Sequence, residues 1–267
     1  MTDRYAVIGN PISHSLSPKI HRIFAIATGE KLMYEALLAE DFGSECKAFF
    51  ENGGRGLNVT LPFKLDAFDW VDEVDASAQE ARAVNTVVAT ETCYRGHNTD
   101  GIGLLRDLGR NLGVVLEEKR VLILGAGGAV RGVLGPLSRA RPASLIIANR
   151  TVDKAQTVSS QFNGVEHVPL DALGTDYDVV INGTSIGMDG QSSFEGLIDQ
   201  SIVEGAFCYD MFYVLDGDTP FCKWGREHGA IGVEGGLGML IEQAAEAFSL
   251  WRGIRPSTKG IASAICD

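Results

Sequence analysis

The sequence predicts an α/β fold in two domains. Strand-like and helix-like patterns alternate along nearly the whole chain, which is typical of parallel sheets covered by helices. The 267 residues exceed one typical domain, since domains run to roughly 100–200 residues. A fresh strand–helix–strand unit with a glycine-rich turn begins after residue 100. We therefore expect one domain from residues 1–100 plus 237–267 and a second from residues 101–236.

The first part of the chain is expected to form the first sheet and its helices. Strands are predicted at 5–9, 32–39 and 56–61, and residues 86–96 resemble a strand pair or one bent strand. The first helix is expected to begin with Ser17 as its N-cap and Pro18 in its first turn. Further helices are predicted at 41–54, where glycines close the helix, around 64–72 and 76–83, and from Asn98-Thr99-Asp100 through about Leu112.

A second series of strands predicts the second domain. These strands are expected at 120–128, 144–150, 165–170, 178–184 and 206–213, with helical patterns between several of them. Residues 237–252 have apolar side chains spaced by three and four positions, which predicts one long helix near the end of the chain.

The composition disfavours several classes of protein. A formal net charge of −12 disfavours nucleic-acid binding, which depends on phosphate neutralisation by Lys and Arg. Five scattered cysteines without a CxxC pair indicate reduced thiols in a cytoplasmic protein. The five histidines form neither an HExxH motif nor a Cys/His cluster, so no metal site is expected. The chain lacks a run of roughly 18 apolar residues and a signal-peptide pattern, so no membrane association is expected.

The strongest local motif is the glycine-rich turn that follows the strand at residue 120. Gly125 permits a tight turn, Gly127 lets the backbone approach a pyrophosphate, and the next helix offers free N–H groups. Val130 replaces the third glycine of GxGxxG, and a bare GxG can also be an ordinary turn. The strand before it and the helix after it favour a dinucleotide-binding loop. The second domain is therefore predicted to be of the Rossmann type, with its dinucleotide-binding loop at Gly125, Ala126, Gly127, Gly128 and Ala129.

The end of the next strand favours NADP over NAD. No carboxylate stands at the end of that strand, where NAD-specific folds carry an acidic residue for the ribose hydroxyl. The strand is followed by Asn149, and next to it Arg150, Thr151 and Lys154 could instead surround a 2′-phosphate. Asp153 lies nearby and tempers the positive charge. The alternative is a solvated basic start to the following helix.

Several polar clusters fall at the ends of predicted elements in the first domain. Residues just past the carboxyl ends of parallel strands share one edge of a sheet, so Ser15, Ser17, Thr60 and Lys64 are expected to converge there. Asn85 and Asp100 precede further elements and could join them. Each also has a simpler explanation: Ser17 or Asp100 as a helix cap, Asn85 as a turn residue, and Lys64 as a surface lysine.

A series of motifs favours the functional explanation of these residues, because the motifs resemble those of a known family. In order they are GNPISHSLSP (9–18), NVTLPFK (58–64), AVNT (83–86), NTDGIGLL (98–105), GAGGAVRGV (125–133), ANRT (148–151), NGTSIGM (182–188), YDMFY (209–213) and GLGMLIEQA (236–244). Together, over almost the whole chain, they resemble the shikimate dehydrogenase family, whose members reduce 3-dehydroshikimate with NADPH. The resemblance implies an N-terminal α/β substrate domain plus a Rossmann-type NADP-binding domain, with a cleft between them.

The resemblance also implies a role for each site residue. Lys64 and Asp100 would form the catalytic pair. The substrate would be bound by Ser15 and Ser17 through its carboxylate, with help from Tyr213, and through its hydroxyls by Asn58, Thr60, Asn85 and Gln243. Met211 and Gly235 would lie near the nicotinamide, and Gly235 departs from the aspartate usual in the family.

Three other functions compete with this interpretation. The first is a quinate/shikimate dehydrogenase that uses NAD, which Arg150, Thr151 and Lys154 disfavour. The second is a non-catalytic NADP-sensing homologue, which would have lost Lys64 or Asp100. The third is an amino-acid or folate-type dehydrogenase, which SHSLSP and NVTLPFK disfavour. The partner is expected to be a small-molecule substrate, and the chain is expected to be a monomer or homodimer.

Overall fold

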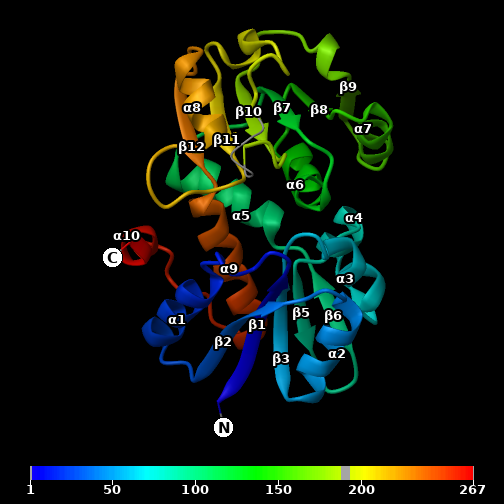
Figure 1. Cartoon of the computed structure of the whole chain (residues 1–267), viewed down its shortest axis with the longest axis vertical. Coiled ribbons are helices and arrows are strands. Elements are labelled where there is room, and N and C mark those ends of the chain that lie inside the picture. Colours follow the sequence, from blue (N-terminus) through cyan, green and yellow to red (C-terminus); the bar gives the residue numbers. More distant parts are fainter. Residues whose placement is uncertain (1, 188–192, 267) are drawn as a thin grey trace. The chain divides into compact units, whose positions relative to one another are not determined.

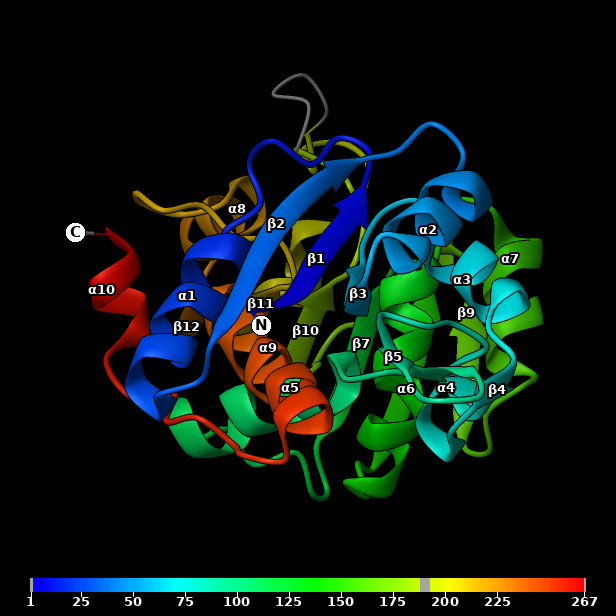
Figure 2. The same cartoon turned by 90° about the horizontal axis from the view of Figure 1, so that it is seen from below.

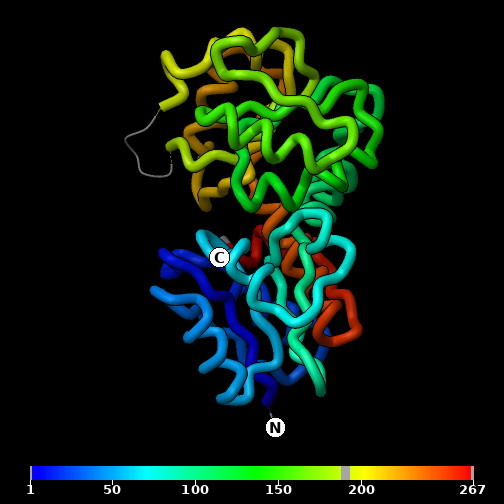
Figure 3. Tube along the Cα trace, turned by 90° about the vertical axis from the view of Figure 1, so that its right-hand side faces the viewer, coloured from blue at the N-terminus to red at the C-terminus, as the bar shows by residue number. Residues whose placement is uncertain are grey.

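The computed structural model describes residues 2–187 and 193–266 of the chain. It contains two compact units (Figure 1). Unit 1 comprises Met1–Leu104 and Leu240–Asp267, and unit 2 comprises Leu105–Met239. The tube in Figure 3 follows the chain as it leaves unit 1 once and returns to it once. The sequence placed these two boundaries a few residues earlier, after residues 100 and 236.

Unit 1 contains a six-stranded sheet in the order β2-β1-β3-β5-β6-β4. Its strands are β1 (Asp3–Gly9), β2 (Leu32–Leu38), β3 (Gly54–Val59), β4 (Glu73–Val74), β5 (Thr86–Ala89) and β6 (Tyr94–His97). The strand pair predicted at 86–96 is confirmed as β5 and β6. The expectation of a purely parallel sheet is wrong here, because β5 runs antiparallel to both β3 and β6. The short turn between β5 and β6 makes that pair antiparallel, since parallel strands need a much longer crossover.

Helices cover both faces of the unit 1 sheet (Figure 2). Ala6 and Ile8 of β1 share a buried cluster with Phe49 and Phe50 of α2, whereas Tyr5 stacks on Trp251 of α9. The alternation follows from the period of two along a strand. The helices of this unit are α1 (Ser17–Thr28), α2 (Phe42–Glu51), α3 (Lys64–Trp70), α4 (Ala76–Ala81) and α10 (Ile261–Cys266), while α5 (Asp100–Arg106) and α9 (Leu237–Arg252) cross the unit boundary.

The start of α1 differs from its prediction. Ser17 is the first residue of the helix, Leu16 occupies the N-cap position, and no side chain caps the helix there. The Ser15 hydroxyl accepts a hydrogen bond from the Ser17 amide at 3.3 Å. The expectation that Ser17 is the N-cap is therefore wrong, because Leu16 occupies that position and the Ser15 hydroxyl satisfies the Ser17 amide.

Unit 2 contains a six-stranded sheet in which every pairing is parallel. Its order is β12-β11-β10-β7-β8-β9, the 3-2-1-4-5-6 arrangement of Rossmann folds. The strands are β7 (Arg120–Leu124), β8 (Ser144–Ala148), β9 (Val165–Val168), β10 (Val179–Asn182), β11 (Phe207–Asp210) and β12 (Gly232–Gly235). The α-helices are α6 (Gly128–Arg139), α7 (Val152–Ser159) and α8 (Pro220–Glu227). β12 was not predicted, because its sequence GVEG lacks a strand-like pattern.

The helix expected from Asn98 through about Leu112 is α5, and a π-helical turn over Asp107–Asn111 continues it.

No helix in the described ranges has the length and hydropathy needed to cross a bilayer.

Candidate active site

Strand register brings distant polar residues of unit 1 to one edge of its sheet. Asn58 of β3 lies opposite Thr86 of β5, and Thr86 lies opposite His97 of β6. Because β5 is antiparallel to both neighbours, its start coincides with their carboxyl ends. Asn85 at the start of β5 therefore meets Asn58 from one side and the segment after His97 from the other.

Lys64 and Asp100 form an ion pair at this edge. The Lys64 Nζ lies 2.6 Å from Asp100 Oδ2, and the two side chains are only 12% and 6% exposed. Lys64 is the first residue of α3 and Asp100 the first residue of α5, so each charge is carried by a helix start. A buried cation held by a carboxylate is poor evidence of stabilisation, because desolvation opposes the attraction. Such a pair suits a lysine that donates a proton or stabilises a negative charge.

Asn85 links this ion pair to the rest of the cluster. Its Nδ2 donates to Asp100 Oδ1 at 2.8 Å and to Thr99 Oγ1 at 2.9 Å, while its Oδ1 accepts the Thr99 amide at 2.8 Å. The backbone amide can only donate, so it fixes the orientation of the Asn85 side chain. Gln243 joins through its Oε1, which accepts the Thr99 hydroxyl at 3.3 Å.

The remaining predicted substrate residues occupy different positions. Ser17 and Asn58 are buried, with 4% and 5% exposure, and Ser15 is half-buried. Thr60 directly follows β3, and its methyl group lies 2.4 Å from where a side chain at Gly9 would begin, so Gly9 must lack one. Tyr213 belongs to unit 2.

Sequence reasoning missed three members of the cluster as site residues. Thr86 and Thr99 are almost wholly buried and hydrogen bond to Asn85. Their position beside Asn85 and Asp100 in the chain was a usable signal. Tyr34 donates to Asn58 Oδ1 at 2.7 Å, but it lies within β2 and no local pattern distinguishes it from other strand tyrosines.

A second layer supports the segment that carries Asp100. The Asp75 carboxylate caps α4, accepting from the Ala78 amide at 2.9 Å and the Ser77 hydroxyl at 2.6 Å. The Ser77 hydroxyl in turn accepts the Asn98 amide at 2.9 Å, and Asn98 Oδ1 accepts the Asp100 amide at 3.1 Å. Burial alone would raise the pKa of Asp75, but hydrogen bonds from His97, Ser77 and the Ala78 amide lower it to about 2.

We expect Asp75→Ala to lower the free energy of unfolding by about 1–2 kcal/mol at pH 7, allowing for partial solvent screening. Because the folded pKa lies below the unfolded value of 3.8, this stabilisation is present above about pH 4 and disappears as the pH falls towards 2. Urea unfolding of both proteins between pH 7 and pH 2 measures it. The exposed Asp69 provides the control Asp69→Ala. An equal loss at pH 7 and pH 2 would contradict this interpretation.

The glycine-rich turn of unit 2 has the geometry of a phosphate loop. Gly125 has φ +115°, and a side chain there would come within 2.9 Å of the Gly183 carbonyl oxygen. Gly127 is exposed and a Cβ added to it would meet nothing within 4 Å, so a ligand can approach its backbone. Gly128 then begins α6, whose first amides have no partner within the helix. These features fit a pyrophosphate at Ala126, Gly128 and Ala129.

The departure at Val130 has a structural explanation. Val130 is fully buried, and its Cγ2 lies 2.4 Å from where a Cβ at Gly183 would stand. Gly183 follows β10, so the glycine is supplied by the neighbouring strand instead of by the third position of the motif. Close packing of helix against sheet is thereby kept.

The residues predicted to hold the adenosine phosphate follow β8. Arg150, Thr151 and Lys154 are exposed, and Asn149 is half-buried with its Nδ2 bonded to the Thr151 carbonyl at 3.0 Å. Within the described residues Arg150 and Lys154 form no ion pair, so both charges are available to an anion.

Met211 and Gly235 follow or end neighbouring strands of the same sheet. The buried Asp210 accepts from Asn182 at 2.9 Å, from Thr219 at 2.6 Å and from the Phe212 amide at 3.1 Å, and so fixes the turn that carries Met211. A Cβ at Gly235 would come no closer than 3.4 Å to Thr219 Cγ2. The Cβ of the aspartate that is usual in the family would thus fit at this position with ordinary van der Waals distances.

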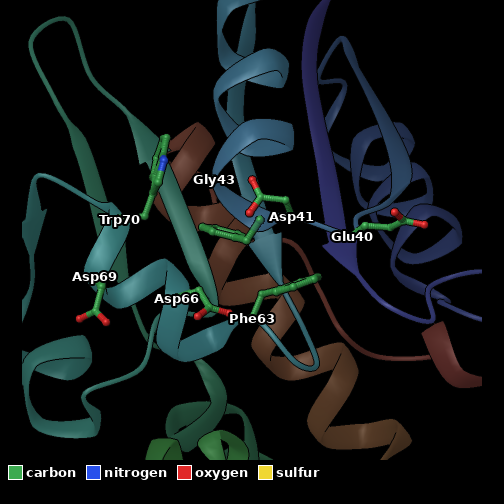
Figure 4. Close-up of a pocket in the computed structure, with 8 residues that line it drawn as sticks. Glu40, Asp41, Gly43, Phe63, Asp66, Asp69 and Trp70 are labelled. Carbon is green, nitrogen blue, oxygen red and sulfur yellow. The ribbon is translucent and has the colours of Figure 1, made fainter.

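A surface hollow of unit 1 is distinct from the Lys64 cluster. Figure 4 shows it, lined by Glu40, Asp41, Phe42, Gly43, Phe63, Asp66, Asp69 and Trp70. Its carboxylates disfavour an anionic ligand. Among the residues that the structure describes, no group of three or more His, Cys, Asp or Glu could hold a metal ion.

Comparison with known proteins assigns this arrangement to a family. The shikimate dehydrogenase substrate binding domain matches residues 7–87, shikimate/quinate 5-dehydrogenase matches residues 107–189, and the shikimate 5′-dehydrogenase C-terminal domain matches residues 236–266. The chain is 49% identical over 270 residues to the shikimate dehydrogenase (NADP(+)) of Alkalilimnicola ehrlichii, with 99% of both chains covered. The chain belongs to the shikimate dehydrogenase family. A relative of the same name from Aromatoleum aromaticum is also 49% identical, over 98% of this chain and 96% of its own.

Solved structures agree with this assignment to the shikimate dehydrogenases. An Ael1 enzyme from Pseudomonas putida has a TM-score of 0.90 and 42% identity, over 99% of this chain and 98% of its own. Shikimate 5-dehydrogenase from Thermus thermophilus, in complex with NADP(H) and shikimate, has a TM-score of 0.85 and 33% identity, over 99% and 98%. The predicted family and the predicted two-domain α/β fold are confirmed.

Proposed function

We propose that this shikimate dehydrogenase catalyses the reversible reduction of 3-dehydroshikimate to shikimate with NADPH. The observation that carries the proposal is the buried contact of Lys64 with Asp100, at 2.6 Å, within a cluster of amide and hydroxyl groups. A regulatory homologue that only sensed NADP would have no use for a buried lysine–carboxylate pair, whose desolvation is costly. The relatives named above are NADP(+) enzymes, which disfavours the NAD-dependent alternative.

The catalytic step assigned to this chain concerns the carbonyl oxygen of the ketone. When bound, reduced NADP supplies the hydride. Negative charge then develops on the carbonyl oxygen. Lys64 stabilises this charge and donates a proton to the oxygen. Asp100 holds the Lys64 ammonium in place and accepts a hydrogen bond from a substrate hydroxyl. Asn85 holds the other oxygen of Asp100 and so keeps the pair oriented.

The substrate contacts proposed here follow from donor and acceptor chemistry. Ser15 and Ser17 lie at the start of α1, where a carboxylate is favoured. Asn58, Thr60, Asn85 and Gln243 offer amides and a hydroxyl that match ring hydroxyls. Tyr213 of unit 2 is proposed as a further carboxylate contact.

The coenzyme contacts proposed here lie in unit 2. The turn from Gly125 to Ala129 would hold the pyrophosphate, and Asn149, Arg150, Thr151 and Lys154 would surround the 2′-phosphate. Met211 and Gly235 would adjoin the nicotinamide. Unit 1 is thus proposed as the substrate domain and unit 2 as the NADP domain. We further infer a cytoplasmic enzyme that is a monomer or homodimer and binds no nucleic acid.

An absorbance assay at about 340 nm with purified protein tests this function. Shikimate and quinate are each offered with NADP⁺ and with NAD⁺. We expect turnover with shikimate and NADP⁺ to exceed every other combination by at least about tenfold in kcat/KM, which corresponds to about 1.4 kcal/mol. Faster turnover with quinate or with NAD⁺ would contradict the assignment, and no turnover with any pair would overturn it.

A further inference from the structure

The hydrogen-bond partners of Asn58 allow its side-chain amide only one orientation. Its Nδ2 donates to the Asn85 carbonyl at 3.3 Å and to Thr86 Oγ1 at 3.0 Å. The carbonyl can only accept, and Thr86 directs its own proton to Asn85 Oδ1 at 2.9 Å. The oxygen of the Asn58 amide must therefore face the other way, where the hydroxyl of Tyr34 donates to it at 2.7 Å.

Tyr34 is equipped to be that donor. Burial raises the pKa of the Tyr34 hydroxyl well above 10, and a hydrogen bond from the Ser17 side chain opposes the rise. The phenol is thus protonated at working pH and has one proton to donate. Its one proton is therefore committed to Asn58 Oδ1.

The Tyr34 ring is itself held in place. The imidazole of His21 stacks on it with the ring centroids 4.2 Å apart and an angle of 6° between the planes. His21 is fully buried, and Phe24 packs edge-on against it at 5.9 Å. The ring cannot swing away from Asn58 without disturbing this aromatic stack.

We propose that Tyr34 is a positioning residue for substrate binding, which acts by fixing the Asn58 amide. The inference rests on the proposed function, since it concerns how the same site holds its substrate. It goes beyond the motifs of the family, because Tyr34 lies in none of them. Without the phenol proton the buried oxygen of Asn58 is left without a donor, which costs free energy and favours displacement of the side chain from the position that the substrate needs.

The test is a double-mutant cycle with Tyr34→Phe and Asn58→Ala. We expect Y34F to raise KM for shikimate about tenfold, leaving kcat within about threefold and KM for NADP⁺ unchanged. In the N58A background the same substitution should change KM less than about twofold, because Tyr34 acts through Asn58. Tyr94→Phe is the matched control, because the Tyr94 hydroxyl has no hydrogen bond in the described part of the chain and its ring packs on Trp70.

The outcomes separate this inference from the proposed function. An equal Y34F effect in both backgrounds, or a Y34F variant indistinguishable from Y94F, overturns this inference. The proposed function stands in that case, because the wild type is active. A Y34F protein that fails to fold, by circular dichroism and NADP⁺ binding, also overturns it, because the hydroxyl would then serve the fold. A wild type that neither turns over nor binds shikimate by calorimetry overturns the function and this inference together.

Discussion

Replacing Lys64 with alanine is expected to lower kcat by about 10²–10⁴-fold, the usual contribution of a positioned acid–base group. The Lys64 ammonium is the cation held by Asp100, and its loss would remove the proton and the charge that we propose to act on the carbonyl oxygen. The coenzyme loop lies in unit 2, so the affinity for NADP⁺ should stay within about twofold. Steady-state kinetics with shikimate, together with fluorescence titration of NADP⁺, measure the two effects.

Two further variants separate chemistry from folding. Lys64→Ala leaves Asp100 buried without its counter-ion, which costs stability as well as rate. Asp100→Asn keeps the shape of the carboxylate but not its charge, and should also reduce kcat by at least about tenfold. Lys47→Ala removes a lysine that is 71% exposed and should change nothing. A folded Lys64→Ala protein with kcat within a few-fold of wild type would show that Lys64 is not the catalytic group.

Replacing Arg150 with alanine is expected to raise KM for NADP⁺ by about 10–100-fold, since hydrogen bonds to a charged group contribute about 1.5–3 kcal/mol. Arg150 is exposed and forms no ion pair within the described residues, so its guanidinium is available to the 2′-phosphate. NAD⁺ lacks that phosphate, so KM for NAD⁺ should not change and the preference for NADP⁺ should fall by the same factor. Parallel kinetics with the two coenzymes measure this.

The control for Arg150 comes from the same unit. Arg226 is 62% exposed and paired with Asp218, so Arg226→Ala removes an equal charge from unit 2 without touching the loop after β8. Adding Lys154→Ala to Arg150→Ala should weaken NADP⁺ binding further. An Arg150→Ala enzyme that loses affinity equally for both coenzymes would indicate stacking on the adenine instead of phosphate recognition.

Local chemistry in the sequence was sufficient for the coenzyme loop. Gly125 needs its positive φ and Gly127 its open surface, and both requirements are visible in the spacing of the glycines. The substitution at Val130 could not be interpreted in the same way, because the compensating glycine, Gly183, stands on another strand.

The first sheet shows where pattern reasoning fails. The strand pair at 86–96 could be recognised, but its direction relative to β3 depends on pairing between residues far apart in the chain. That pairing makes the sheet mixed and places Asn85 beside Asn58. Ser17 was also wrongly predicted to be the N-cap. The sequence pattern does not show whether the hydroxyl of Ser15 or that of Ser17 accepts the hydrogen bond from the start of the helix.

The sequence by itself determined the α/β class, the two units, the glycine turn and, through its motifs, the family. These depend on periodicity, backbone chemistry and short contiguous segments, all of which are local. Only the tertiary structure decided that Lys64 touches Asp100, that Thr99 orients Asn85, and that Tyr34 reaches Asn58. Such contacts join residues widely separated in the chain, and hydrogen bonds are set by ångström-scale positions that no local pattern encodes.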